Sequence, residues 1–153
     1  MFFVFLLMLT GLGQISLDAY LPALPTIANQ LQVSNSIIQH TFALFLLPMA
    51  LSQFIYGPLS DHVGRKNVLL LGLFIFTFGS VICASSDQYL HLIFGRILQG
   101  LGIGATSSLC KAIARDRFDG KELRRVNAAM ILAWGVSLTS APYLGSLIQY
   151  YLS

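Results

Sequence analysis

Long apolar runs separated by short polar stretches dominate the chain. Five runs are rich in leucine, isoleucine, phenylalanine and alanine, and polar residues interrupt the pattern before each new run begins. A helix of about 20 apolar residues spans the hydrocarbon core of a bilayer. The pattern therefore predicts five transmembrane helices, at residues 2–22, 37–56, 68–84, 89–110 and 126–151.

The composition supports a membrane protein. Of the 153 residues, 56% are hydrophobic and 10% are charged, whereas about 25% of the residues of a typical globular domain are charged. A soluble domain of this size could not bury so much apolar surface. We therefore expect an all-α integral membrane protein with the lipid bilayer as its solvent.

The first run, residues 2–22, could also be read as a secretory signal peptide. It lacks a basic segment before the apolar residues, it is long, and no small-x-small cleavage site precedes Asp18. We therefore interpret it as the first membrane helix.

Lysine and arginine gather on one side of the predicted helices. Arg65 and Lys66 lie between the second and third helices, and six more lie between the fourth and fifth: Lys111, Arg115, Arg117, Lys121, Arg124 and Arg125. The connections at 26–36 and 85–88 have none. Because cytoplasmic loops carry an excess of basic residues, the pattern predicts a cytoplasmic N-terminus in a multi-pass protein.

Two ionisable residues, Asp18 and Arg96, fall inside predicted membrane helices. Either one costs at least about 2.5–3.5 kcal/mol at the bilayer centre, so we interpret both as functional. With a rise of about 1.5 Å per residue, both lie in the outer half of the membrane, where they could face each other or a shared aqueous cavity. A carboxylate in such a cavity can take up and release a proton. The alternatives are a static ion pair that only fixes helix packing, or Asp18 reaching the outer headgroups.

Small residues are frequent in the fourth and fifth predicted helices. Gly100 and Gly104 form a small-xxx-small pair, which lets helix backbones approach closely in lipid. No strand precedes this stretch, so we reject a dinucleotide-binding loop. Pro142 predicts a kink in the fifth helix.

The other chemistry-bearing residues favour neither an enzyme nor a metal site. Cys83 and Cys110 have no metal-ligand spacing, and we expect free thiols that pack as small apolar groups. The basic run at 111–125 adjoins two membrane helices and contains acidic residues, so topology explains it better than nucleic-acid binding does.

The connection Gly57–Lys66 reads GPLSDHVGRK. At every defining position it resembles the signature loop between helices 2 and 3 of the major facilitator superfamily, G-x-L-[A/S]-D-x-x-G-R-[K/R]. Residues 92–102, which include Arg96 and Gln99, resemble the helix 4 motif of the superfamily. Residues 141–146, APYLGS, are similar to its helix 5 antiporter motif G-P-x-x-G-G, with alanine and serine replacing two glycines.

Residues 18–25, DAYLPALP, are similar to the D-x-Y-L-P-A-x-P segment of the Bcr/CflA group of drug:proton antiporters, which are exporters of the bacterial inner (plasma) membrane. The resemblance covers essentially the whole chain. It implies that residues 1–153 are a partial N-terminal domain, with five helices matching most of a six-helix half. Members have about twelve spans in two halves with the substrate between them. The implied partner is therefore the second transporter half or a full-length carrier.

The resemblance also implies roles for individual residues. Proton coupling and the cavity would involve Asp18, Arg96 and Gln99. A cytoplasmic gate would involve Gly57, Asp61, Gly64, Arg65 and Asp116. The antiporter bend would be formed by Pro142 and Gly145. Phe45 and Tyr20 are candidate cavity-facing residues. For the gate, the alternative is that Asp61 caps a helix and Arg65 only anchors the topology.

The implied function is proton-coupled efflux of small amphipathic drugs, energised by the proton gradient without a cofactor. The alternative is a non-transporting membrane fragment or an assembly partner of a full-length carrier. A carrier self-assembled from antiparallel copies would need dual topology, which the strong charge bias disfavours.

Overall fold

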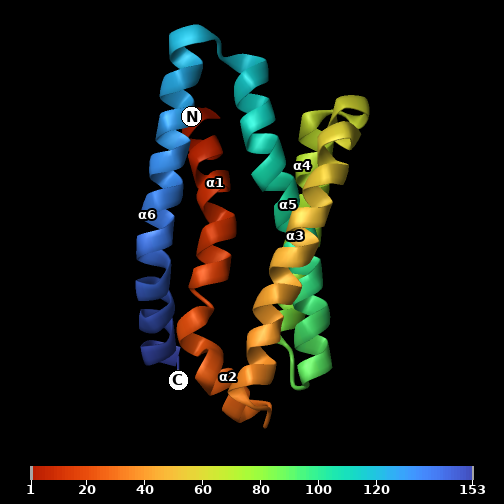
Figure 1. Ribbon diagram of the computed structural model, residues 1–153, viewed down its shortest axis with the longest axis vertical. Coiled ribbons are helices and arrows are strands. Elements are labelled where there is room, and N and C mark those ends of the chain that lie inside the picture. Colours follow the sequence, from red (N-terminus) through yellow and green to blue (C-terminus); the bar gives the residue numbers. More distant parts are fainter. Residues whose placement is uncertain (1, 153) are drawn as a thin grey trace. The chain divides into compact units, whose positions relative to one another are not determined.

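The computed structural model describes residues 2–152 (Figure 1). The first membrane segment contains α1 (Phe2–Asp18), the short 3-10 helix η1 (Leu21–Ala23) and α2 (Leu24–Gln30). Four long helices follow, namely α3 (Asn35–Val63), α4 (Arg65–Ala84), α5 (Tyr89–Arg117) and α6 (Gly120–Leu152). No strand occurs in this part of the chain. Met1 and Ser153, the end residues of the predicted domain, lie outside the described residues.

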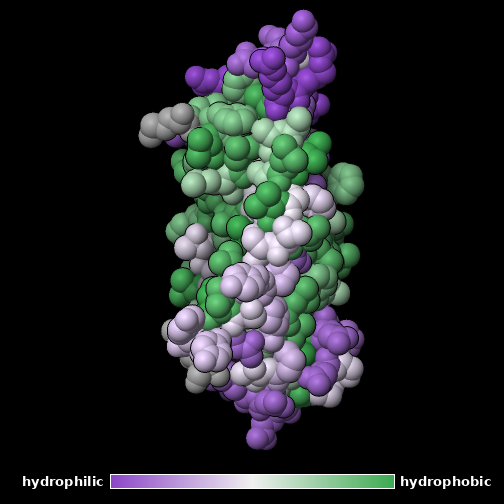
Figure 2. Space-filling view, turned by 90° about the vertical axis from the view of Figure 1, so that its left-hand side faces the viewer, coloured by the Kyte–Doolittle hydropathy of each residue, from purple (hydrophilic) through white to green (hydrophobic). Residues whose placement is uncertain are grey.

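Five segments within residues 2–152 are long and apolar enough to cross a membrane: Phe2–Gln30, Asn35–Val63, Arg65–Ala84, Tyr89–Arg117 and Gly120–Tyr151. Large apolar side chains lie on their outer surfaces; Phe54, for example, is 79% exposed. Figure 2 shows apolar surface over much of the middle of one face, with hydrophilic side chains gathered toward its ends. The predicted all-α membrane fold with five spans is confirmed.

The helices extend further into their polar ends than predicted. α3 continues to Val63 through a stretch predicted as a polar loop, so that Gly64 alone separates it from α4. α5 continues to Arg117 and α6 begins at Gly120, so most of the basic run at 111–125 is helical. The loop predictions were wrong because a drop in hydrophobicity marks where a helix leaves lipid. It does not mark where the backbone hydrogen bonds of that helix end.

The first membrane segment is interrupted rather than continuous. α1 ends at Asp18, whereas the prediction extended the helix to Pro22. Pro22 lies in η1 and Pro25 in α2. Proline lacks a backbone N–H, so Pro22 cannot donate the hydrogen bond that would continue α1 past Asp18. Proline does not end every helix of the chain, because Pro48 and Pro58 lie inside α3 and Pro142 lies inside α6. α2 itself occupies part of the stretch predicted as a polar connection.

The chain forms two compact units, the first comprising residues up to 23 together with residues 110 onward, and the second comprising residues 24–109. In the first unit, α1 and η1 pack against α6. A Cβ atom added to Gly145 of α6 would lie 2.9 Å from the Cα atom of Ala19, so no larger residue fits there without movement of the backbone.

In the second unit, α5 packs against α3 and α4 through glycines. A Cβ added to Gly100 would lie 3.1 Å from the carbonyl carbon of Phe45, and one added to Gly104 would lie 2.8 Å from the carbonyl oxygen of Met49. The predicted small-residue pair therefore faces α3. Gly102, between them in sequence, faces α4 instead. Close backbone approach takes the place of the hydrophobic driving force that is absent between helices in lipid.

Candidate functional site

A cluster of buried and half-buried polar side chains lies between α4 and α5 in the second unit. Arg96 is 4% exposed, and its Nη1 donates a hydrogen bond of 3.2 Å to Oε1 of Gln99. The Gln99 Nε2 donates a bond of 2.9 Å to Oγ of Ser80. The Cys83 thiol donates to the same Gln99 Oε1 at 3.5 Å. The carboxamide of Gln99 is therefore engaged at both ends, which fixes its acceptor toward the guanidinium.

Helix geometry explains why these residues meet. Arg96 and Gln99 are three residues apart on α5, and Ser80 and Cys83 are three apart on α4, so each pair shares one helix face. The helices approach closely because Gly79 has no side chain; a Cβ there would lie 2.7 Å from the backbone nitrogen of Gln99. The small residue on α4 brings its polar neighbours within reach of α5.

An aromatic ring from α3 also lies beside Arg96. The guanidinium carbon of Arg96 lies 5.9 Å from the centroid of the Phe45 ring. Phe45 is fully buried. A cation over an aromatic ring is attracted by its quadrupole, an effect of about 0.5–2 kcal/mol. Arg96, predicted as a functional charge within the membrane, is thus positioned by three helices of one unit.

Ser80 and Cys83 are functional candidates that the sequence interpretation missed. Cys83 was expected to pack as a small apolar group, but its thiol takes part in hydrogen bonding. Both cysteines are free, as predicted. Among the described residues, no group of three or more histidine, cysteine, aspartate or glutamate side chains could hold a metal ion.

Asp18 is the last residue of α1 and is 7% exposed. Its carboxylate accepts a hydrogen bond from the side-chain amide of Gln14, one helical turn earlier. Sequence interpretation missed Gln14, although the four-residue spacing to Asp18 could have identified it. Asp18 belongs to the first unit and Arg96 to the second, so a shared cavity remains a prediction.

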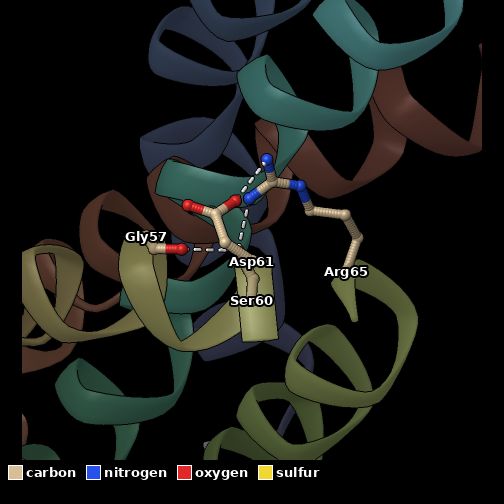
Figure 3. A network of polar contacts seen from close by, with 4 residues as sticks. All are labelled: Gly57, Ser60, Asp61 and Arg65. Carbon is tan, nitrogen blue, oxygen red and sulfur yellow. Dashed lines mark hydrogen bonds and ion pairs between the residues drawn. The ribbon is translucent and has the colours of Figure 1, made fainter. Parts of the chain in front are cut away.

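An ion pair joins the end of α3 to the start of α4 (Figure 3). Nη2 of Arg65 lies 2.7 Å from Oδ1 of Asp61, and Nη1 of Arg65 donates to Oγ of Ser60. The buried Ser60 hydroxyl in turn donates to the backbone carbonyl of Gly57 at 2.7 Å. Between the two charged residues, Gly64 adopts φ +96° and ψ 139°. The four predicted gate residues of this turn therefore come together, and Ser60 joins them.

The remaining predicted site residues lie in the first unit. Asp116 is exposed in the last turn of α5, and its pairing with the α3–α4 turn remains a prediction. α6 continues through Pro142 as helix. Gly145, one turn later, packs against the backbone of Ala19.

Comparison with known sequences decides the family. Residues 3–153 match the model of the Major Facilitator Superfamily. The chain belongs to this superfamily. It is 38% identical over 92% of its length to the uncharacterized MFS-type transporter YdgK of Bacillus subtilis (strain 168). It is 31% identical over 94% of its length to Multidrug resistance protein D of Escherichia coli (strain K12).

The alignments cover only part of these superfamily members. A third relative, Multidrug resistance protein MdtL of Klebsiella pneumoniae (strain 342), is 33% identical over 87% of this chain. The matched regions are 35%, 36% and 34% of the lengths of the three relatives. The chain therefore spans about a third of the curated relatives it matches.

In this member of the superfamily, the signature between α3 and α4 depends on a single glycine conformation. Replacing Gly64 by alanine is expected to lower the free energy of unfolding by about 1–3 kcal/mol, because a φ near +96° is strained for any residue with a Cβ. Unfolding of the purified chain in SDS-containing micelles, followed by circular dichroism, measures the change.

The control for this prediction is Gly57→Ala, seven residues earlier. Gly57 is helical and a Cβ there meets nothing within 4 Å, so alanine should be neutral or stabilise by about 0.5–1 kcal/mol. Equal effects of the two substitutions would contradict the assignment of strain to Gly64.

Proposed function

We propose that the chain is the N-terminal part of a proton-coupled exporter of small amphipathic molecules in the bacterial inner membrane. The observation that carries the proposal is the buried Arg96–Gln99 cluster inside a helix able to cross the membrane. The names of two relatives refer to multidrug resistance, which supports export as the direction and drugs as the substrate class.

The physical argument concerns a charge that lipid disfavours. An arginine within a membrane helix is costly and is typical of substrate or ion pathways. Gln99 accepts a hydrogen bond from the guanidinium of this cation and the Phe45 ring lies beside it, which orients the cation. A fixed cation of this kind can attract an anionic carboxylate and release it once that carboxylate is protonated. Asp18 is the carboxylate that we assign to this exchange.

The remaining predicted residues fit a carrier that alternates between two states. The Asp61–Arg65 pair is partly exposed, and exposed pairs contribute only about 0–1 kcal/mol, so it can break and re-form at little cost. In the proposed mechanism the pair is a gate on the cytoplasmic side, with Asp116 as its third charge. The close packing at Gly145 and the proline one turn earlier serve as the antiporter bend. The proton gradient supplies the energy, and no covalent chemistry or cofactor is involved.

The positions of lysine and arginine determine the membrane orientation of the proposed exporter. The basic start of α4, end of α5 and start of α6 face the cytoplasm, which places the N-terminus there as well. Apolar and aromatic side chains offer amphipathic substrates contact area with little hydrogen-bond selectivity, which accords with a diverse set of small drugs.

The test is drug-dependent proton exchange. The chain is expressed in cells that lack their main efflux pumps, and everted membrane vesicles are prepared from these cells. Respiration energises the vesicles, and the fluorescence of acridine orange reports the pH gradient across their membrane. Addition of ethidium or chloramphenicol is expected to dissipate part of the gradient, and a protonophore should abolish the response. Asp18→Asn should lose at least about nine-tenths of the exchange while inserting normally, because an amide cannot take up the proton. Exchange by Asp18→Asn equal to that of the unmodified chain would refute the coupling role.

A second candidate function follows from the share of the relatives that the chain covers. Because it spans about a third of their length, half of a substrate site between two transporter halves would have to come from elsewhere. In that case the chain is a non-transporting membrane fragment or an assembly partner of a full-length carrier. Absence of exchange by the chain alone, with altered exchange when a full-length carrier is co-expressed, would favour this candidate.

A further inference from the structure

Six basic side chains are concentrated where α5 ends and α6 begins, within the first unit. We call them the basic rim, and they are Lys111, Arg115, Arg117, Lys121, Arg124 and Arg125. All six are exposed. The three carboxylates of the same stretch leave it with a net charge of +3.

The basic rim is not neutralised within its own unit. Among the described residues of this unit, no ion pair joins a carboxylate to five of its members, namely Lys111, Arg115, Lys121, Arg124 and Arg125. Lys111 and Arg115 are four residues apart on α5, and Lys121 and Arg125 are four apart on α6. Like charges at this spacing repel each other. Anions from outside the chain would relieve that repulsion.

The basic rim adjoins apolar surface of the kind that lipid covers. The rings of Phe2 and Phe118 lie 6.4 Å apart between centroids, and the guanidinium carbon of Arg117 lies 4.5 Å from the Phe2 centroid. Aromatic side chains are enriched at membrane interfaces. Further along α6, Ile131 and Leu132 are both 69% exposed. One helix thus presents cations at one level and lipid-facing side chains about two turns below.

We infer that the basic rim binds the headgroups of anionic phospholipids and selects them over zwitterionic ones along α6. The phosphates would contact the exposed cations while the acyl chains cover the apolar side chains below. Each surface cation near an anionic leaflet corresponds to about a fivefold change in affinity. The inference concerns the lipid partner of the chain and holds whether or not the chain transports.

Trp134 provides a reporter for this inference. It is the only tryptophan of the chain, lies on α6 and is 45% exposed. It follows Arg125 by nine residues, which is about 14 Å along the helix and therefore at the depth of the acyl chains. Lipid carrying bromine on its acyl chains quenches tryptophan only on contact.

The experiment compares two lipids around the purified full chain. The chain is reconstituted in mixtures of phosphatidylglycerol and phosphatidylcholine, with one lipid or the other brominated. At low salt, brominated phosphatidylglycerol is expected to quench the fluorescence of Trp134 more than brominated phosphatidylcholine does. The difference should correspond to at least about fivefold stronger binding of phosphatidylglycerol. The preference should fall to about one at high salt, because salt screens exposed charges. Equal quenching by the two lipids at low salt, in the unmodified chain, would overturn the inference.

A variant that lacks three cations of the basic rim tests whether the lipid preference arises there. The combined substitution Lys121→Gln, Arg124→Gln and Arg125→Gln should reduce the preference to less than about twofold. Lys66→Gln removes one exposed cation from the α3–α4 turn and should leave the preference unchanged. Circular dichroism and gel filtration establish that both variants fold. A preference that survives the triple substitution would assign the selectivity to another surface and overturn the inference.

Discussion

Replacing Gly102 by alanine is expected to lower the free energy of unfolding by about 3 kcal/mol, in the upper part of the usual range for overpacking. The added Cβ would lie 2.7 Å from Cα of Phe76 and 2.5 Å from the carbonyl oxygen of Gly72. Both obstructing atoms belong to the backbone of α4, so no side-chain rotation can make room. α4 and α5 would have to separate, and helix contacts in lipid depend on close van der Waals packing.

The measurement for Gly102→Ala is an SDS titration of the purified chain, and the matched control is Gly135→Ala. Gly135 is helical as well, but a Cβ added there meets nothing within 4 Å. Alanine at this position should be neutral or stabilise by about 0.5–1 kcal/mol. If the two variants unfold with free energies within about 0.5 kcal/mol of each other, the close contact between α4 and α5 is refuted.

The membrane spans could be predicted from sequence because their length and apolar content are fixed by the bilayer. Only a shared role was predicted for Arg96 and Gln99, but their contact has an equally local cause, since two residues three apart on a helix lie on one face. The same holds for Asp61 and Arg65, which are four residues apart and remain close across Gly64. These features depend on local spacing alone.

The partners contributed by other helices could not be predicted. Ser80 reaches Gln99 only because Gly79 and Gly95 bring two backbones together at a particular register. In a soluble protein, an apolar stripe would mark the contacting faces of the two helices. In lipid, the outward face is as apolar as the inward one, so hydrophobicity does not indicate how two helices are rotated toward each other.

The helices α3 and α5 were predicted too short for a related reason. Residues 57–63 and 111–117 are polar enough to resemble loops, yet they continue α3 and α5. Helices maintain their hydrogen bonds in water as well as in lipid, and α3 continues even through Pro58 to Val63. Residues with positive φ follow both ends, namely Gly64 directly after α3 and Gly120 three residues after the end of α5. The change of solvent was therefore mistaken for a change of backbone structure.

Replacing Arg96 by lysine is expected to reduce drug-dependent proton exchange to below about a tenth, although the positive charge is kept. A hydrogen bond to a charged group contributes about 1.5–3 kcal/mol, and each 1.4 kcal/mol corresponds to about a tenfold change. The ammonium group of lysine is a compact point charge. It cannot both lie over the Phe45 ring and present a planar donor to Gln99. The measurement is the acridine orange assay in everted vesicles, with Arg96→Ala beside Arg96→Lys.

The control is Phe94→Leu, which changes an exposed residue two positions earlier on α5 and should leave exchange unchanged. A second readout does not require transport. In a Cys110→Ser background, maleimide labelling of Cys83 should accelerate at least about threefold in Arg96→Lys, because the Gln99 carboxamide that holds the thiol loses one of its two anchors. Full exchange by Arg96→Lys but not by Arg96→Ala would mean that charge alone suffices, and the orientation set by Gln99 and Phe45 would then have no part in coupling.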